Sequence, residues 1–446
     1  MLNQSFYLFG MKLFGYGLRL VVPYFLVRQL SVADFGAYRQ FFLMEAYADA
    51  LFQLGLNQAL YYFVPRDMRN AGAYLLNSVA MNCIIFSLAF GLLGVFSGQV
   101  AAWLNMAVVH DAFGLLAAYI IVKMLIASAD AYLTARSCVR AAGLFDVLGQ
   151  ALASAGCVAA AFATGELMAV LAALVAARAV QLVAMAAYIQ FALRGFRADR
   201  YFFGIGEQIR YGFVLGMAGT LMTQLMRLHD FFVSRYYGTE AYAVYSAGCT
   251  EIPVIQLFTQ SVAVVALGQF ALLEQQGDWE GIRRLWRRVL TSSYAITIPA
   301  VIGFLLLGRI VIGVMFTKAY LAAVPVFAVN SVLKIGLIFN ATLVLRAMRR
   351  NDITIWVNAI SLVLALPLLY AGMKLGGTLG IISAQALLII GSRVVSVAVM
   401  NRVVPEPLPY FVSPGDLRDF YRESWAKLRS RLRARPPAGP GPAGES

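Results

Sequence analysis

Charged residues are scarce in this chain of 446 residues, at 13% of the sequence against 61% for hydrophobic residues. A typical soluble domain is about 25% charged and about 45–50% apolar. Because a folded surface in water still needs polar cover, a soluble core could not absorb this excess. The composition therefore excludes a soluble enzyme, a disordered chain and a nucleic-acid-binding domain, and it indicates a polytopic α-helical membrane protein.

Residues that bind metals or catalyse reactions are also few, with 2 histidines and 4 cysteines. The spacing of Cys83, Cys138, Cys157 and Cys249 matches neither a zinc site nor a disulfide framework. The sequence also lacks a P-loop, a nucleophile elbow and an HExxH motif. We therefore expect no metal, no cofactor and no enzymatic activity, so an ion gradient or the membrane potential would have to drive any transport.

Long apolar runs fill most of the chain. A membrane-spanning helix needs about 20 mostly apolar residues. Twelve such stretches occur, roughly at 5–28, 36–64, 73–98, 112–135, 144–164, 167–193, 209–233, 241–270, 289–311, 323–346, 353–373 and 378–401. This pattern predicts an all-α polytopic membrane protein with about 12 transmembrane helices.

Basic residues predict the orientation in the membrane. The net charge is +14, and 23 of the 36 basic residues lie in one set of loops and the tail, against 6 on the other side. Cytoplasmic loops carry such an excess, so we expect both termini in the cytoplasm. In the tail, 402–446, the run from Ser413 to Asp416 predicts a helix N-cap.

The tail helix that this cap begins is amphipathic and basic, which suits the surface of an anionic membrane. A solvated charged face that only fixes topology explains the same pattern. The Pro/Gly-rich end of the tail predicts a disordered segment.

Short sequences repeat between the two halves of the chain. Phe25 to Arg28 (FLVR) recurs 207 residues later as Phe232 to Arg235 (FVSR). An offset of 210 relates Arg136 and Arg140 to Arg346 and Arg350. The repeat predicts two pseudo-symmetric six-helix lobes, 1–193 and 209–401, joined by a cytoplasmic linker at 194–208. Such duplication is typical of transporters that bind substrate between the halves.

Ionisable residues inside the apolar stretches are the candidate site, because a charge at mid-membrane costs about 2.5–3.5 kcal/mol and usually faces a polar cavity or a partner. The candidate cations for an anionic substrate are Arg19, Lys123, Arg178, Arg227 and Lys334. The candidate ion-coupling acids are Glu45, Asp49, Asp230 and Glu251, and the candidate polar cavity residues are Gln53, Asn57 and Gln224. Interhelical ion pairs that only hold the bundle together are the alternative explanation.

Four segments resemble the bacterial polysaccharide flippases of the multidrug/oligosaccharidyl-lipid/polysaccharide (MOP) exporter superfamily. They are RQLSVADFGAY at 28–38, LGLN at 54–57, GDWEGIRRL at 277–285 and MFTKAYLAAVPVF at 315–327. The resemblance implies a MATE-like, V-shaped transporter of two lobes that opens alternately to either side of the bacterial inner membrane.

The same resemblance implies a substrate, an undecaprenyl-pyrophosphate-linked oligosaccharide used to build O-antigen, capsule or exopolysaccharide. The expected partners are this lipid-linked oligosaccharide, membrane lipids and a polysaccharide polymerase or export complex, and nucleic acid is not expected. Arginine suits the pyrophosphate through its bidentate fork. Two alternatives stay open: an export component of a synthase complex that uses no lipid carrier, and a MATE-like ion-coupled small-molecule antiporter.

Overall fold

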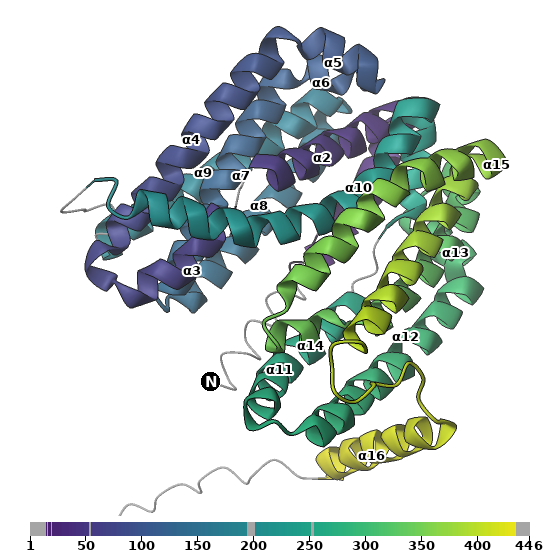
Figure 1. The fold of residues 1–446 in the computed structure, drawn as a ribbon. Coiled ribbons are helices and arrows are strands. Elements are labelled where there is room, and N and C mark those ends of the chain that lie inside the picture. Colours follow the sequence, from purple (N-terminus) through teal and green to yellow (C-terminus); the bar gives the residue numbers. More distant parts are fainter. Residues whose placement is uncertain are drawn as a thin grey trace, which may run out of the picture. The chain divides into compact units, whose positions relative to one another are not determined.

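The computed structural model describes residues 15, 17–18, 20–52, 55–193, 201–250 and 254–433, and these residues form helices and no strand (Figure 1). A short apolar helix, Leu20–Gln29, comes first. The elements that follow are α2 (Val32–Phe52), α3 (Leu56–Arg66), η1 (Met68–Asn70), α4 (Ala71–Val95), α5 (Ser97–Leu104), α6 (Val108–Asp111), α7 (Phe113–Ala135), α8 (Val139–Thr164), α9 (Leu167–Leu193), α10 (Ile205–Gly248), α11 (Val254–Gln276), α12 (Trp279–Met315), η2 (Lys318–Ala323), α13 (Val324–Leu333), η3 (Lys334–Ile338), α14 (Thr342–Ala347), α15 (Asn351–Met400) and α16 (Pro414–Arg433).

Seven helical segments among the described residues are long and apolar enough to cross a membrane. The helical, membrane-spanning fold class predicted from composition is thus confirmed. Two of the long helices, α10 and α15, each contain an internal break. Gly238 interrupts α10 with a φ of 81°, and Gly377 interrupts α15 with a φ of 59°. α10 and α15 therefore each consist of two helices. Counted in this way, the number of helices comes closer to the twelve apolar stretches of the sequence.

Three apolar stretches that the sequence presents as continuous are broken in the structure. The stretch 36–64 divides at Gly55, whose φ is +68° and whose added Cβ would overlap the backbone of Gly212. The stretch 241–270 divides where α10 ends and α11 begins, and 323–346 divides at η3. Hydropathy does not register these breaks, because it averages over a window of residues in which the few polar ones are outweighed by apolar neighbours.

The chain separates into two compact units, and each is described by itself. Unit 1 comprises Met1–Glu251, Leu307–Asn330 and Ile355–Leu388, and unit 2 comprises Ile252–Leu306, Ser331–Thr354 and Ile389–Ser446. The core of unit 1 lies where α3, α4, α7 and α9 meet, and its buried side chains include Leu60, Tyr74, Tyr132, Met185 and Ile189. These units have different bounds from the predicted lobes, 1–193 and 209–401, which remain a prediction.

Close helix packing in unit 1 depends on small residues. A side chain at Gly36 on α2 would overlap the backbone carbonyl of Thr239 on α10. Gly372 and Gly380, on the two halves of α15, are so close that a Cβ at either would overlap the backbone of the other. Lipid tails are as apolar as leucine side chains, so the hydrophobic effect does not drive helices together inside a membrane. They associate instead through close packing of this kind.

In unit 1, the side chain of Arg28 binds the last carbonyl groups of α12. Arg28 donates hydrogen bonds to the Val314 carbonyl at 2.9 Å and the Met315 carbonyl at 3.4 Å, and also to the carbonyl of Tyr24. The last carbonyls of a helix lack internal partners and carry partial negative charge. Arg28 satisfies both needs, although it lies almost 300 residues earlier in the chain.

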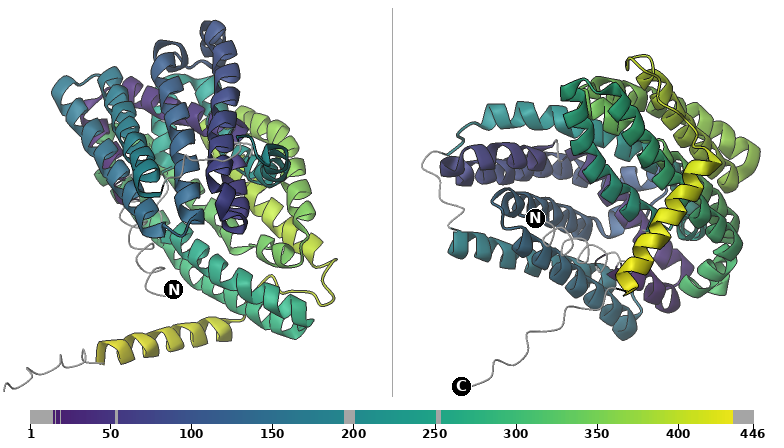
Figure 2. Two further views of the ribbon diagram at one scale, coloured as in Figure 1. Left: turned by 90° about the vertical axis from the view of Figure 1, so that its left-hand side faces the viewer. Right: turned by 90° about the horizontal axis from the view of Figure 1, so that it is seen from below.

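In unit 2, α16 and the segment before it are fastened to the first turns of α12 (Figures 1 and 2). The indole of Trp286 is buried and donates to the Pro409 carbonyl at 2.9 Å, while the Tyr421 hydroxyl donates to the Ala295 carbonyl at 2.6 Å. Arg287 pairs with Asp416 at 2.9 Å. The predicted amphipathic tail helix is present, and these contacts fix its first turns.

Candidate functional site

Three of the predicted site residues form one ion-paired group in unit 1. The Lys123 ammonium, on α7, contacts the Glu45 carboxylate and lies 3.6 Å from the Asp49 carboxylate; both acids are on α2. The side chain of Glu45 is 9% exposed, whereas those of Asp49 and Lys123 are about one-third exposed. Two carboxylates therefore share the Lys123 ammonium.

Next to this group, a chain of buried polar side chains joins three helices. Asn82 on α4 donates to the Ser128 hydroxyl of α7 at 2.9 Å, and Ser128 donates to the Asn57 carbonyl oxygen of α3 at 2.7 Å. Among the described residues, the buried amide nitrogen of Asn57 has no hydrogen-bond partner. Asn57 therefore fixes helix packing and retains one unused donor.

Arg178 is held by neutral groups. Near the middle of α9, it donates to the Gln181 side-chain oxygen at 2.7 Å and to the Gln150 side-chain oxygen of α8 at 2.6 Å. Gln181 in turn donates to the Phe145 carbonyl at 3.1 Å. No carboxylate in the described part of the chain forms an ion pair with Arg178. The guanidinium is thus oriented by two amides and keeps its full positive charge.

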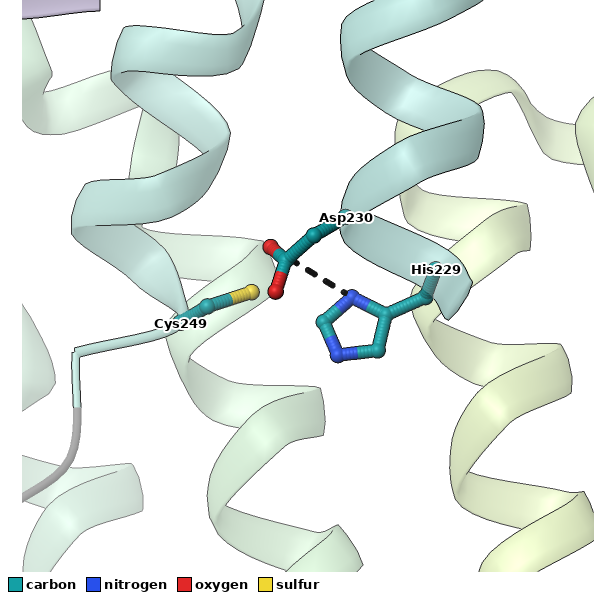
Figure 3. A group of neighbouring side chains, drawn as sticks. All are labelled: His229, Asp230 and Cys249. Carbon is teal, nitrogen blue, oxygen red and sulfur yellow. Dashed lines mark ion pairs between the residues drawn. The ribbon is translucent and has the colours of Figure 1, made fainter. Parts of the chain in front are cut away.

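A third group lies on α10 and just beyond it (Figure 3). The Asp230 carboxylate is 3.5 Å from the Arg227 guanidinium and 3.7 Å from His229 Nδ1. Tyr245 places its hydroxyl 2.8 Å from the same nitrogen. The Sγ of Cys249 lies within 4.8 Å of the His229 and Asp230 ligand atoms. Asp230 and His229 are buried, at 2% and 7% exposure.

The remaining predicted residues are placed separately. Lys334 begins η3 in unit 2, at the end of α13. Gln224 lies on α10 with its buried side-chain nitrogen unpartnered within the described ranges. Arg19, Gln53 and Glu251 lie outside the described residues.

The structure thus pairs several of the predicted cations with predicted acids. Lys123 pairs with two acids and Arg227 pairs with Asp230, while Arg178 donates hydrogen bonds to two amides. The amides Gln150 and Gln181 were not among the predicted residues, although polar residues within apolar stretches could have marked them. Their pairing across α8 and α9 depends on helix packing, which hydropathy does not reveal.

The comparisons with known proteins fit this arrangement of helices and buried charges. The chain from 25 to 325, well over half its length, matches the model of a family described as polysaccharide biosynthesis proteins. The chain belongs to this family. No curated protein matches it in sequence.

Several solved structures share the fold of this polysaccharide biosynthesis family member. A multidrug resistance MATE family transporter of the MOP superfamily, in its inward-facing conformation, has a TM-score of 0.74 at 13% identity, with 86% of this chain and 94% of that chain covered. The lipid II flippase MurJ, in an inward closed conformation, has a TM-score of 0.67 at 13% identity over 98% and 94%. A MOP superfamily transporter from Pyrococcus furiosus, described as having a binding pocket of reverse polarity, has a TM-score of 0.62 at 14% identity over 89% and 93%.

The expected resemblance to MOP superfamily transporters is therefore confirmed. At these identities the likeness establishes the fold, and the family match establishes the link to polysaccharide biosynthesis. Together they indicate a multi-pass membrane protein of the polysaccharide biosynthesis family with the fold of MOP superfamily transporters.

Proposed function

We propose that this protein flips an undecaprenyl-pyrophosphate-linked oligosaccharide across the bacterial inner membrane by alternating access, for synthesis of a cell-surface polysaccharide. The observation that carries the proposal is the family match over 25–325, taken together with a fold shared with a lipid II flippase. Membership in polysaccharide biosynthesis calls for a sugar substrate, and a transporter fold within the membrane calls for one that is attached to a lipid.

The charges of the chain support an anionic headgroup. A pyrophosphate that leaves water needs fixed positive charge, and a guanidinium binds phosphate oxygens through two parallel hydrogen bonds. Arg178 meets this need best among the described cations, because no carboxylate there pairs with it and two amides orient it. Arg19, Lys123, Arg227 and Lys334 complete the proposed cation set.

Ion coupling is assigned to the group of Glu45, Asp49 and Lys123. Two carboxylates that lie this close to one ammonium repel each other when both are ionised, and the repulsion is costly in a low-dielectric environment. Binding of a proton or a sodium ion would make the group neutral. Transport coupled to a cation gradient therefore has a binding site for that cation on α2, close to α7.

The flippase proposal is tested with the full-length protein in liposomes that contain a fluorescent polyprenyl-pyrophosphate oligosaccharide. A membrane-impermeant quencher reports how much lipid has crossed. We expect rapid crossing with the wild-type protein and at least a tenfold lower rate with Arg178→Gln, since a hydrogen bond to a charged group contributes about 1.5–3 kcal/mol. Arg178→Lys should fall in between, because lysine keeps the charge and loses the planar fork.

The matched control is Arg140→Gln, which removes an exposed arginine from the first turn of α8 and should leave the rate unchanged. If the wild-type protein does not accelerate lipid crossing but expels a small cationic dye, the antiporter alternative replaces the flippase. Full activity of Arg178→Gln would instead remove Arg178 from the headgroup site.

A further inference from the structure

The break in α10 brings three metal-ligand side chains together. His229 and Asp230 lie before Gly238, and Cys249 comes directly after the helix ends (Figure 3). The helix reverses at Gly238, where φ is 81°, so its two halves run side by side. The ligand atoms His229 Nδ1, Asp230 Oδ and Cys249 Sγ all lie within 4.8 Å of one another.

The donor types define the class of ion. Imidazole nitrogen and thiolate sulfur select zinc-like divalent ions, whereas sodium, magnesium and calcium prefer oxygen ligands. With bonds of about 2.0–2.3 Å in tetrahedral geometry, the ligand atoms of a bound zinc ion would lie about 3.5 Å apart. The ligand atoms lie within 4.8 Å of one another in the structure, so the group would contract by about 1 Å on binding the ion.

The surroundings also suit an ion of charge +2. Bound to the Asp230 carboxylate, a Cys249 thiolate and a neutral imidazole, such an ion forms a group without net charge. That is the least costly state for an ion in a buried site. The Tyr245 hydroxyl hydrogen-bonds His229 Nδ1 at 2.8 Å in the metal-free protein; metal binding at this nitrogen would break that bond and leave the neutral hydroxyl beside the fourth position.

We propose that His229, Asp230 and Cys249 form a binding site for a thiophilic divalent metal ion of the zinc class. The ion would fasten the two halves of α10 to each other on either side of Gly238. Binding of the ion by Asp230 would also weaken the ion pair between Asp230 and Arg227, whose charged groups lie 3.5 Å apart in the metal-free structure. The proposal is argued from the geometry of these three residues and not from the transported substrate, so it stands whether or not the protein is a flippase.

The test uses the full-length protein, purified in detergent with metal-free buffers and titrated with cadmium, which binds like zinc and gives an ultraviolet charge-transfer band with thiolates. We expect one equivalent to bind with growth of this band, and zinc to displace it. Cys249→Ser should abolish the band. Cys157→Ser is the matched control, because Cys157 is also buried but its thiol donates to the Val170 carbonyl at 3.8 Å and belongs to no group of metal-ligand side chains in the described part of the chain.

Two further variants separate this site from adventitious binding. His229→Ala should weaken cadmium binding at least tenfold, while His110→Ala, which removes the other histidine, should leave it unchanged. Elution volume and helical circular dichroism show whether each variant is folded. The proposal is overturned if the wild-type protein gives no thiolate band, or if the band survives in a folded Cys249→Ser protein.

Discussion

At the residue scale, the most informative difference between sequence and structure is the position of Lys123. As a sequence position it is one of five cations suited to an anionic headgroup. In the structure it lies between Glu45 and Asp49. The role of a charge in a membrane helix is therefore argued from its partners, and Arg178, which donates hydrogen bonds to two amide oxygens, is the stronger candidate for the headgroup residue.

The acids of this group lead to a prediction about coupling. Glu45→Gln leaves Lys123 paired with Asp49 alone, which makes the pair neutral without a bound cation. We expect transport in liposomes to continue down a substrate gradient and to lose its response to an imposed proton or sodium gradient. Glu207→Gln changes an exposed acid of α10 and should keep the response. A full gradient response in Glu45→Gln and in Asp49→Asn would show that the coupling site lies elsewhere.

At the scale of elements, the first turn of α16 shows how one acid performs two tasks. Asp416 accepts hydrogen bonds from the Ser413 backbone at 3.1 Å and from Arg287 on α12 at 2.9 Å, and Ser413 accepts from the Asp416 backbone. Partial desolvation raises the pKa of Asp416, but the hydrogen bonds from Ser413 and Arg287 outweigh it and hold the pKa below the ordinary value.

The tail helix is therefore expected to depend on pH. Because the folded-state pKa of Asp416 is depressed, its contribution is present above the unfolded-state value of about 3.9 and is lost as the pH falls through the folded-state value. Asp416→Asn should remove this stabilisation of α16 at neutral pH. We expect the rate of amide hydrogen exchange in α16 to rise about fivefold, the effect of losing a helix cap. Asp419→Asn, one turn further along, is the control. Unchanged exchange in Asp416→Asn would show that other contacts hold the helix.

At the scale of the whole molecule, the distribution of basic residues predicts the orientation. Both ends of the chain should face the cytoplasm, since the basic excess lies in the loops and tail on that side. A fluorescent protein fused to the C-terminus should fold and fluoresce, and alkaline phosphatase at the same position should stay inactive. Active phosphatase there would reverse the predicted topology.

Composition and hydropathy are enough to predict a helical membrane protein, because both are sums over many residues. The breaks are not predictable in this way. Gly55 interrupts a helix because of its positive φ and its contact with Gly212, which is distant in sequence. The cysteine spacing likewise predicts no metal site, whereas His229 and Cys249 meet only because α10 reverses at Gly238. Such pairings are set by packing and carry no periodic signal.

The bond from Arg28 to the end of α12 also sets an order of events during synthesis. Its partner carbonyl at Val314 is 286 residues further along the chain, and ribosomes add about 5–20 residues per second. The guanidinium therefore waits on the order of 15–60 s after it emerges before this partner exists. Unit 1 cannot be completed earlier, so a nascent chain that stalls before residue 314 leaves an unfinished membrane bundle for quality-control proteases to recognise.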